Sequence, residues 1–122
     1  MPERKHITAD ERKIIHAKCG GRCAYCGCVI TLEQMQADHV IPLALRGADD
    51  MSNLMPSCRS CNHRKSTETV EVFRDTVERW CDVLMRDSVT YKNAVRFGQV
   101  LPNPHPVVFY FESLAAVAEK GE

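Results

Sequence analysis

Four of the seven cysteines form two Cys-x2-Cys pairs, Cys23 with Cys26 and Cys58 with Cys61, and 31 residues separate the pairs. Four thiolates can hold one tetrahedral zinc ion, and two such pairs supply them from two separate turns. Gly27 follows the first pair directly, where a tight turn favours a residue without a side chain. The spacing therefore predicts a structural zinc site that ties the two pairs together.

A disulfide framework is a poor alternative, because an odd number of cysteines cannot pair completely. The N-terminal stretch MPERKHITADERK is charged and lacks the apolar segment of a secretory signal, so we expect a cytoplasmic protein with reduced thiols. A thiol redox site would need only one pair and a βαβ context. Cys28 is an alternative to Cys26 as a ligand, but only Cys26 gives the matched two-residue spacing. Cys19 and Cys81 are expected to be small core residues.

The rest of the 122-residue chain has the composition of one globular domain, with 44% hydrophobic and 26% charged residues. Thr8 and Glu11 form a capping box that predicts a helix over about 9–18. A three- and four-residue apolar repeat predicts a long helix over about 67–86. Its stripe, which we expect to cover the core, comprises Val70, Phe73, Val77, Trp80 or Cys81, and Leu84. The C-terminal VVFYFESLAAVAEK fits a strand or a helix.

Further polar motifs lie between and just after the cysteine pairs. The order is C-x2-C, then ADHVIPL, then Gly47, then Asn53 in SNLMPSC, then the second pair followed by NHRK. This pattern resembles the zinc-containing branch of the HNH endonucleases, which are ββα-metal nucleases that use one divalent cation. The resemblance covers residues 20–66.

The resemblance implies an α+β fold, with a small ββα-metal core that a structural four-cysteine zinc site supports. An N-terminal helix and the long helix after the motif would flank this core. We expect one HNH nuclease domain over residues 1–122, with its motif core at 20–66 and a helical extension at 67–122.

The resemblance also assigns the catalytic residues. Asp38 would be a ligand of the catalytic cation and His39 the general base that activates water. Imidazole suits this role because it accepts a proton near neutral pH. On an extended segment, however, adjacent side chains point to opposite sides, so a local kink or the approach of the helix must bring both to one site.

Two asparagines complete the predicted site. Asn53 matches the central asparagine of the family and would bind backbone, keeping the loop and His39 oriented without touching the metal. Asn62 would supply an amide oxygen to the cation opposite Asp38, which makes the chain an H-N-N variant. His63 is the alternative ligand, although a helical turn of about 100° per residue points it elsewhere.

Basic residues next to the motif suggest contact with nucleic acid. Residues 1–65 carry ten Lys or Arg against seven Asp or Glu, whereas residues 66–122 carry six against nine. We expect Arg59, Arg64 and Lys65 to face the phosphate backbone. The expected partner is DNA, with RNA as the alternative; whether the chain is a monomer or a homodimer stays open. No apolar run approaches the ~20 residues that cross a bilayer, so no membrane association is expected.

The predicted activity is hydrolysis of DNA phosphodiester bonds, giving nicks or double-strand cuts. A carboxylate and an amide are hard oxygen ligands, which favour Mg²⁺ or Mn²⁺ or another divalent cation for catalysis, while zinc is structural. The alternative from another class is a non-catalytic zinc-knuckle module that binds nucleic acid. That module would need the zinc site and the basic residues, but not the Asp38-His39 pair.

Overall fold

The structure is a computed structural model that describes residues 6–103 and 106–120. The chain divides into two compact units. The first comprises the residues up to Val70 together with those from Val108 onward, and the second comprises Glu71–Val107. Each unit is described by itself.

The first unit opens with helix α1, Ala9–Ala17, which confirms the helix predicted at 9–18. The capping box is present: the Thr8 hydroxyl accepts from the Glu11 backbone N–H, and the Glu11 carboxylate accepts from the Thr8 N–H. A cap of this kind typically contributes about 1 kcal/mol to helix stability. The helix buries Ile15 and packs against strand β2, Leu54–Ser57.

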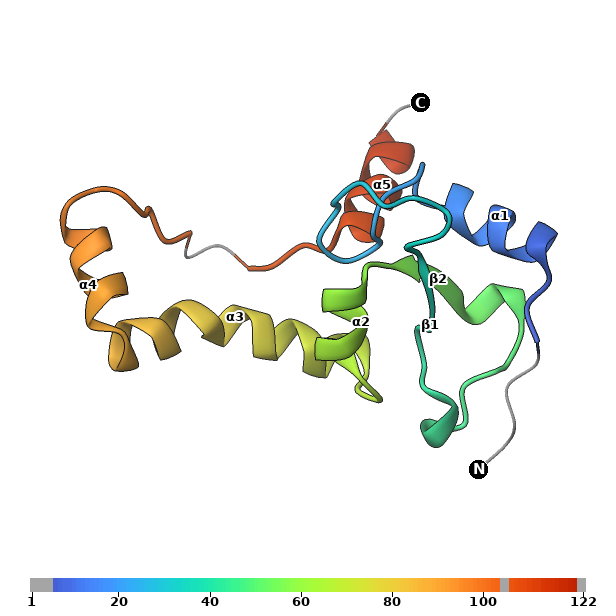
Figure 1. The fold of residues 1–122 in the computed structure, drawn as a ribbon, viewed down its shortest axis with the longest axis horizontal. Coiled ribbons are helices and arrows are strands. Elements are labelled where there is room, and N and C mark those ends of the chain that lie inside the picture. Colours follow the sequence, from blue (N-terminus) through green and yellow to red (C-terminus); the bar gives the residue numbers. More distant parts are fainter. Residues whose placement is uncertain (1–5, 104–105, 121–122) are drawn as a thin grey trace. The chain divides into compact units, whose positions relative to one another are not determined.

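The centre of the first unit is a two-stranded sheet followed by a short helix. Strand β1, Gln36–His39, pairs antiparallel with β2, and helix α2, Arg59–Lys65, follows β2 after one residue (Figure 1). The register places Asp38 opposite Met55 and His39 opposite Leu54. This arrangement of two strands and a helix confirms the predicted α+β class with a small ββα core.

The hydrophobic core of this unit lies between α1 and the sheet. Its buried members are Ile15, Ile30, Met35 and Leu54. Partly buried side chains that pack around them are Ile7, Ala37, Met51 and Cys58. Each fully buried aliphatic side chain of this size contributes roughly 1.5–3 kcal/mol, so four of them make a small core.

The loop between β1 and β2 contains two short 3-10 helices, η1 at Leu43–Leu45 and η2 at Met51–Asn53. Gly47 lies between them, and its backbone N–H donates to the Pro42 carbonyl. A Cβ on this glycine would lie 1.8 Å from the Ile41 carbonyl oxygen, which is backbone and cannot rotate away. The close approach of the two backbone segments therefore requires glycine here.

Replacing Gly47 by alanine is expected to destabilise the first unit by about 3 kcal/mol, the upper end of the usual cost of overpacking. The control is Gly98→Ala, where a Cβ meets open space and only the left-handed backbone conformation is strained. Chemical denaturation of both variants measures the difference. An equal and small loss of stability in both would contradict the proposed close packing at Gly47.

The second unit contains most of helix α3, Val70–Asp87, and helix α4, Val89–Arg96. The long helix predicted at 67–86 is thus confirmed, but the expectation for its apolar stripe is wrong. Of the stripe residues, all of which the structure describes, Phe73 is buried, whereas Trp80 is 40% and Leu84 41% exposed. Cys81 is also exposed, not in the core.

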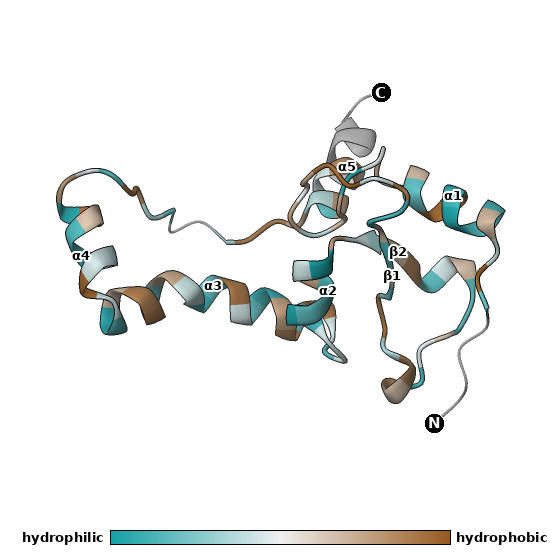
Figure 2. Ribbon diagram, viewed as in Figure 1, coloured by the Kyte–Doolittle hydropathy of each residue, from teal (hydrophilic) through white to brown (hydrophobic). Residues whose placement is uncertain are grey.

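The physical reason is the size of this unit. Glu71–Val107 contains two helices and an irregular segment, too little chain to cover every apolar side chain of an 18-residue helix. Hydrophobic residues recur at intervals along the ribbon of α3 (Figure 2), and among them Phe73 is buried.

The C-terminal segment returns to the first unit as helix α5, Tyr110–Lys120, so the open choice between strand and helix resolves to helix. Its first residues bind the turn that carries the first cysteine pair. The Tyr110 N–H donates to the Tyr25 carbonyl at 3.1 Å, and the Phe111 N–H donates to the Ala24 carbonyl at 2.8 Å. Among the described residues, no helix has both the length and the apolar character needed to span a membrane.

Candidate active site and zinc site

The four paired cysteines converge as the spacing predicted. The sulfur atoms of Cys23, Cys26, Cys58 and Cys61 all lie within 4.8 Å of one another, and the Cys26 and Cys58 sulfurs are 3.9 Å apart. Four thiolates around zinc at about 2.3 Å would lie roughly 3.8 Å apart, so the donor set and its spacing fit a tetrahedral zinc ion.

The thiols of this cluster differ in acidity. The hydrogen bond from the Cys61 thiol, with further donors from backbone, lowers the pKa of Cys23 to about 4. The same hydrogen bond raises the pKa of Cys61. Binding of a metal ion requires the deprotonated form of each thiol, so the cluster would release protons when the ion binds.

Backbone groups shape both turns around the sulfurs. Gly27 has φ of +80° and donates its N–H to the Cys23 carbonyl. The Cys61 N–H donates to the Cys58 sulfur, which makes Cys58 both the cap of α2 and a potential zinc ligand. Zinc at this site would therefore fix the start of α2 relative to the first turn.

Two further cysteines are placed as predicted. Cys28 is outside the four-cysteine group, and Cys19 is buried.

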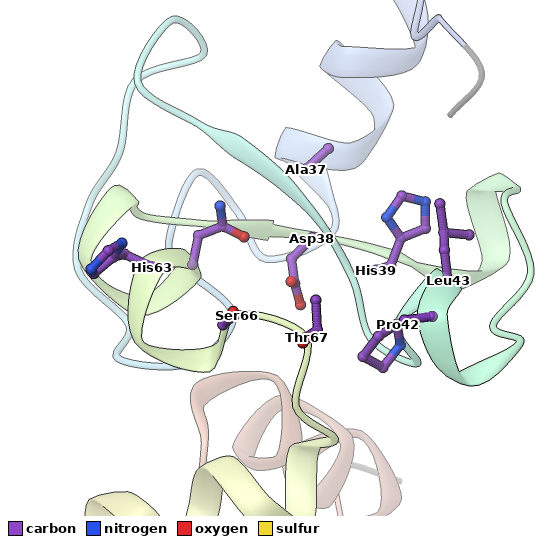
Figure 3. A pocket seen from close by; sticks show the side chains of 10 residues that line it. Ala37, Asp38, His39, Pro42, Leu43, His63, Ser66 and Thr67 are labelled. Atoms are coloured by element: carbon purple, nitrogen blue, oxygen red, sulfur yellow. The ribbon is translucent and has the colours of Figure 1, made fainter. Parts of the chain in front are cut away.

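Asp38 and His39 border the same cavity, which has a volume of about 460 Å³. Asn62 and His63 of α2 line it from another side, together with Pro42 and other residues of the loop (Figure 3). Asp38 is 4% exposed and His39 7%. Asp38 and His39 are the last two residues of β1, and the chain bends at the next residue. Residues of α2 border the same cavity, so both adjacent side chains reach one site, as predicted.

The Asp38 carboxylate already has two hydrogen-bond donors. The Tyr25 hydroxyl donates to Oδ2 at 2.5 Å, and the Lys65 ammonium lies 3.1 Å from Oδ2 and 3.5 Å from Oδ1. Burial and the negative charge of Asp38 raise the pKa of Tyr25 far above its usual value, so its hydroxyl remains a donor. The carboxylate is therefore held from the side of the protein interior.

The expected role of Lys65 as a phosphate contact is wrong. Its side chain is fully buried, and its ammonium binds Asp38 and donates to the His39 carbonyl at 3.0 Å. A buried lysine needs such partners, because an unpaired charge in the interior costs several kcal/mol. Arg59 and Arg64, by contrast, are exposed.

His39 is paired with Asp49 of the loop, at 2.8 Å between Nε2 and Oδ1. An ionised carboxylate only accepts hydrogen bonds, so Nε2 carries the hydrogen in this pair. Nδ1 of the neutral imidazole is then left with its lone pair. The ring is thus held in one orientation and one tautomer, as a general base requires.

Asn53 is 8% exposed and makes hydrogen bonds only of the kind predicted for a strut. Its Oδ1 accepts from the Ile41 N–H, and its Nδ2 donates to the carbonyls of Ile41 and Ala48. These bonds join the two ends of the loop that follows His39. The side chain therefore stabilises the loop and does not enter the cavity.

The neighbours Asn62 and His63 differ in their surroundings. Asn62 is half-buried, whereas His63 is exposed and borders the cavity at a distance from Asp38 (Figure 3). Asp38 and Asn62 line the same cavity, so it is bordered by one carboxylate and one carboxamide, which is the chemistry of a weak site for a small divalent cation.

Sequence reasoning missed two residues that touch this site, Tyr25 and Asp49. Tyr25 lies between the ligands of the first cysteine pair, and its contact with Asp38 spans 13 residues. Asp49 is one of two adjacent aspartates in a polar loop. Neither has a local pattern that distinguishes it from a surface residue.

Comparisons with known proteins agree with this geometry. The profile of the HNH endonuclease family matches residues 23–68. A CRISPR-associated endonuclease Cas9 from Corynebacterium diphtheriae is 31% identical over 75 residues, which are 61% of this chain and 6% of that protein.

The fold of this chain is also similar to part of a solved structure. The Type II-C Cas9 enzyme from Actinomyces naeslundii aligns with a TM-score of 0.50 and 24% identity, over 62% of this chain and 9% of that one. The chain thus spans less than a tenth of the length of either relative. The segment that matches the family profile contains both cysteine pairs, the two strands and α2. Residues 23–68 therefore match the HNH endonuclease family.

Proposed function

We propose that this chain is a metal-dependent endonuclease that hydrolyses DNA phosphodiester bonds. The observation that carries the proposal is the convergence of Asp38, His39 and Asn62 on one cavity beside the four-cysteine site. Hydrolysis of a phosphodiester needs a base for the attacking water and positive charge at the phosphate. The cavity offers an oriented base and oxygen ligands for a cation.

His39 would take the proton from the attacking water. The lone pair on Nδ1 accepts it, and Asp49 stabilises the imidazolium that forms, because its carboxylate lies 2.8 Å from Nε2. Asn53 maintains the loop that connects His39 to Asp49. Oriented bases of this kind typically contribute about 10²–10⁴-fold to a rate.

Asp38 and the amide oxygen of Asn62 would hold the divalent cation, with Mg²⁺ or Mn²⁺ as the expected ions. When bound, such an ion supplies positive charge at the scissile phosphate and the departing 3′ oxygen. The Lys65 ammonium partly neutralises Asp38, so the protein alone offers a weak site. We therefore expect the substrate phosphate to contribute to cation binding.

The exposed residues Arg59 and Arg64 lie on the same short helix as Asn62 and would contact the phosphate backbone. Such contacts add affinity without reading the sequence. One site cuts one strand, so the expected product is a nick. Cleavage of both strands would need a second encounter or a second copy of the chain.

Incubation of the zinc-loaded protein with supercoiled plasmid and Mg²⁺, Mn²⁺ or Ni²⁺ tests this function. The expected result is cation-dependent conversion to nicked circles. The zinc-knuckle binding module predicts a different outcome, namely a retarded plasmid that stays intact, with a shift that weakens steeply as salt rises. That result would contradict the nuclease proposal.

A further inference from the structure

Tyr25 connects the zinc site to the candidate catalytic carboxylate. It lies between Cys23 and Cys26 in the chain, is 3% exposed, and donates its hydroxyl hydrogen to Oδ2 of Asp38. Its backbone N–H also donates to the Cys23 sulfur at 3.4 Å. The main chain of Tyr25 thus belongs to the turn of residues 23–27, here called the zinc turn. Its side chain ends at Asp38, which borders the candidate active-site cavity.

The C-terminal segment holds the Tyr25 ring in place. The rings of Phe109 and Phe111 contact it edge-on, at centroid distances of 5.3 and 6.0 Å. Edge-on aromatic pairs add roughly 0.5–1.5 kcal/mol beyond the area they bury. The backbone hydrogen bonds from Tyr110 and Phe111 to the zinc turn keep this segment in register.

The contacts of the two Asp38 oxygens are unequal. The Tyr25 hydroxyl and the closer contact of the Lys65 ammonium both fall on Oδ2, at 2.5 and 3.1 Å. Oδ1 has the longer contact to the Lys65 ammonium, at 3.5 Å. A carboxylate tied by one oxygen cannot rotate freely, so its other oxygen keeps one direction. Such fixed ligand orientation increases metal affinity.

We propose that Tyr25 is a positioning residue: its hydroxyl fixes Asp38 so that Oδ1 is presented to the divalent cation, and the aromatic residues Phe109 and Phe111 hold Tyr25 in place. This inference rests on the proposed function of Asp38 as a cation ligand. It assigns the C-terminal segment, which lies outside the matched span of residues 23–68, a part in the active site.

The test compares wild type with Tyr25→Phe, which keeps the ring and removes the hydroxyl. Binding of Mn²⁺ is measured directly on the zinc-loaded proteins by the loss of the electron paramagnetic resonance signal of free Mn²⁺. We expect the affinity for Mn²⁺ to fall about tenfold, the lower end of the usual effect of losing a hydrogen bond to a metal ligand. Zinc content should stay the same.

The matched control is Tyr110→Phe. Its ring packs beside Gly27 of the same zinc turn, and its hydroxyl makes no hydrogen bond to the residues that the structure describes. Mn²⁺ affinity should be unchanged in this variant.

If Tyr25→Phe fails to bind zinc or to fold, Phe111→Leu replaces it as the test variant, because it keeps the Tyr25 hydroxyl but loosens the packing of the Tyr25 ring. Its Mn²⁺ affinity should fall in the same direction.

Equal Mn²⁺ affinities of wild type and Tyr25→Phe would overturn the inference, as would a wild type that binds no Mn²⁺ at all. The nicking assay separates this failure from failure of the proposed function. If the wild type nicks plasmid, and nicking by Tyr25→Phe depends on the Mn²⁺ concentration in the same way as nicking by the wild type, only the positioning role is overturned. A wild type that does not nick overturns the nuclease proposal, and the Mn²⁺ titration still decides the role of Tyr25.

Discussion

Replacement of His39 by alanine is expected to lower the rate of plasmid nicking by about 10²–10⁴-fold, the usual contribution of a general base. The imidazole borders the cavity with Asp38, and Asp49 holds its Nε2, so the substitution removes the oriented base of the cavity. The rate is measured under single-turnover conditions with protein in excess and saturating Mn²⁺. Zinc content and thermal stability of the variant should match those of wild type.

The control for this prediction is His6→Ala, because His6 is exposed and outside the cavity. It should nick at the wild-type rate. Equal nicking rates of His39→Ala and wild type would contradict the proposed mechanism, because the activity would then come from another group or from a contaminant. Asp49→Asn should also lower the rate, because an amide neither fixes the tautomer of the ring nor stabilises the imidazolium that forms.

Removal of the zinc ion is expected to unfold the first unit. Its core has four buried aliphatic side chains, and α2 begins at a cysteine that the ion would hold. Zinc bound to four deprotonated ligands in small domains contributes about 10–16 kcal/mol at neutral pH. That value is comparable to the whole stability of a typical domain, about 5–15 kcal/mol.

A strong chelator, or the variant Cys58→Ser, therefore should abolish the cooperative thermal transition seen by far-ultraviolet circular dichroism. Metal analysis of the intact protein should give one zinc per chain. The matched control is Cys81→Ser, a cysteine that is exposed and outside the cluster. A metal-free protein that melts like the zinc-loaded one, with a reversible disulfide in place of zinc, would instead support the redox alternative.

The parts of this fold that sequence reasoning predicted correctly depend on local patterns. The cysteine spacing predicted the four-sulfur cluster, and the capping box of Thr8 and Glu11 predicted the start of α1. The role of Asn53 as a backbone strut also follows from a motif whose partners lie within 12 residues. In these cases the physical cause is contained in a short stretch of chain.

The errors come from contacts that join distant residues. Lys65 has the same local surroundings as Arg64, yet a one-residue step around α2 buries its side chain against β1, where it meets Asp38. The link from Tyr25 to Asp38 likewise depends on the mutual placement of the zinc turn and β1. A sequence pattern cannot show which of several basic or aromatic residues points inward.

The apolar stripe of α3 predicted the helix but not the burial of its side chains. Its periodicity predicted the helix correctly, because a helix places every third and fourth residue on one side. The same periodicity does not say what covers that side. Within the second unit, Trp80 and Leu84 are exposed, so an amphipathic pattern is compatible with a helix that lacks a full core.

The central claim is that this chain hydrolyses DNA at the cavity of Asp38 and His39, and the chemistry of the cut ends tests it most directly. Plasmid nicked by the zinc-loaded protein and Mn²⁺ is purified and treated with DNA ligase. In-line attack by water with departure of the 3′ oxygen predicts 5′-phosphate and 3′-hydroxyl ends, so the ligase should reseal the nicks. Failure to nick with any divalent cation, or nicks that ligase cannot reseal, would contradict the account.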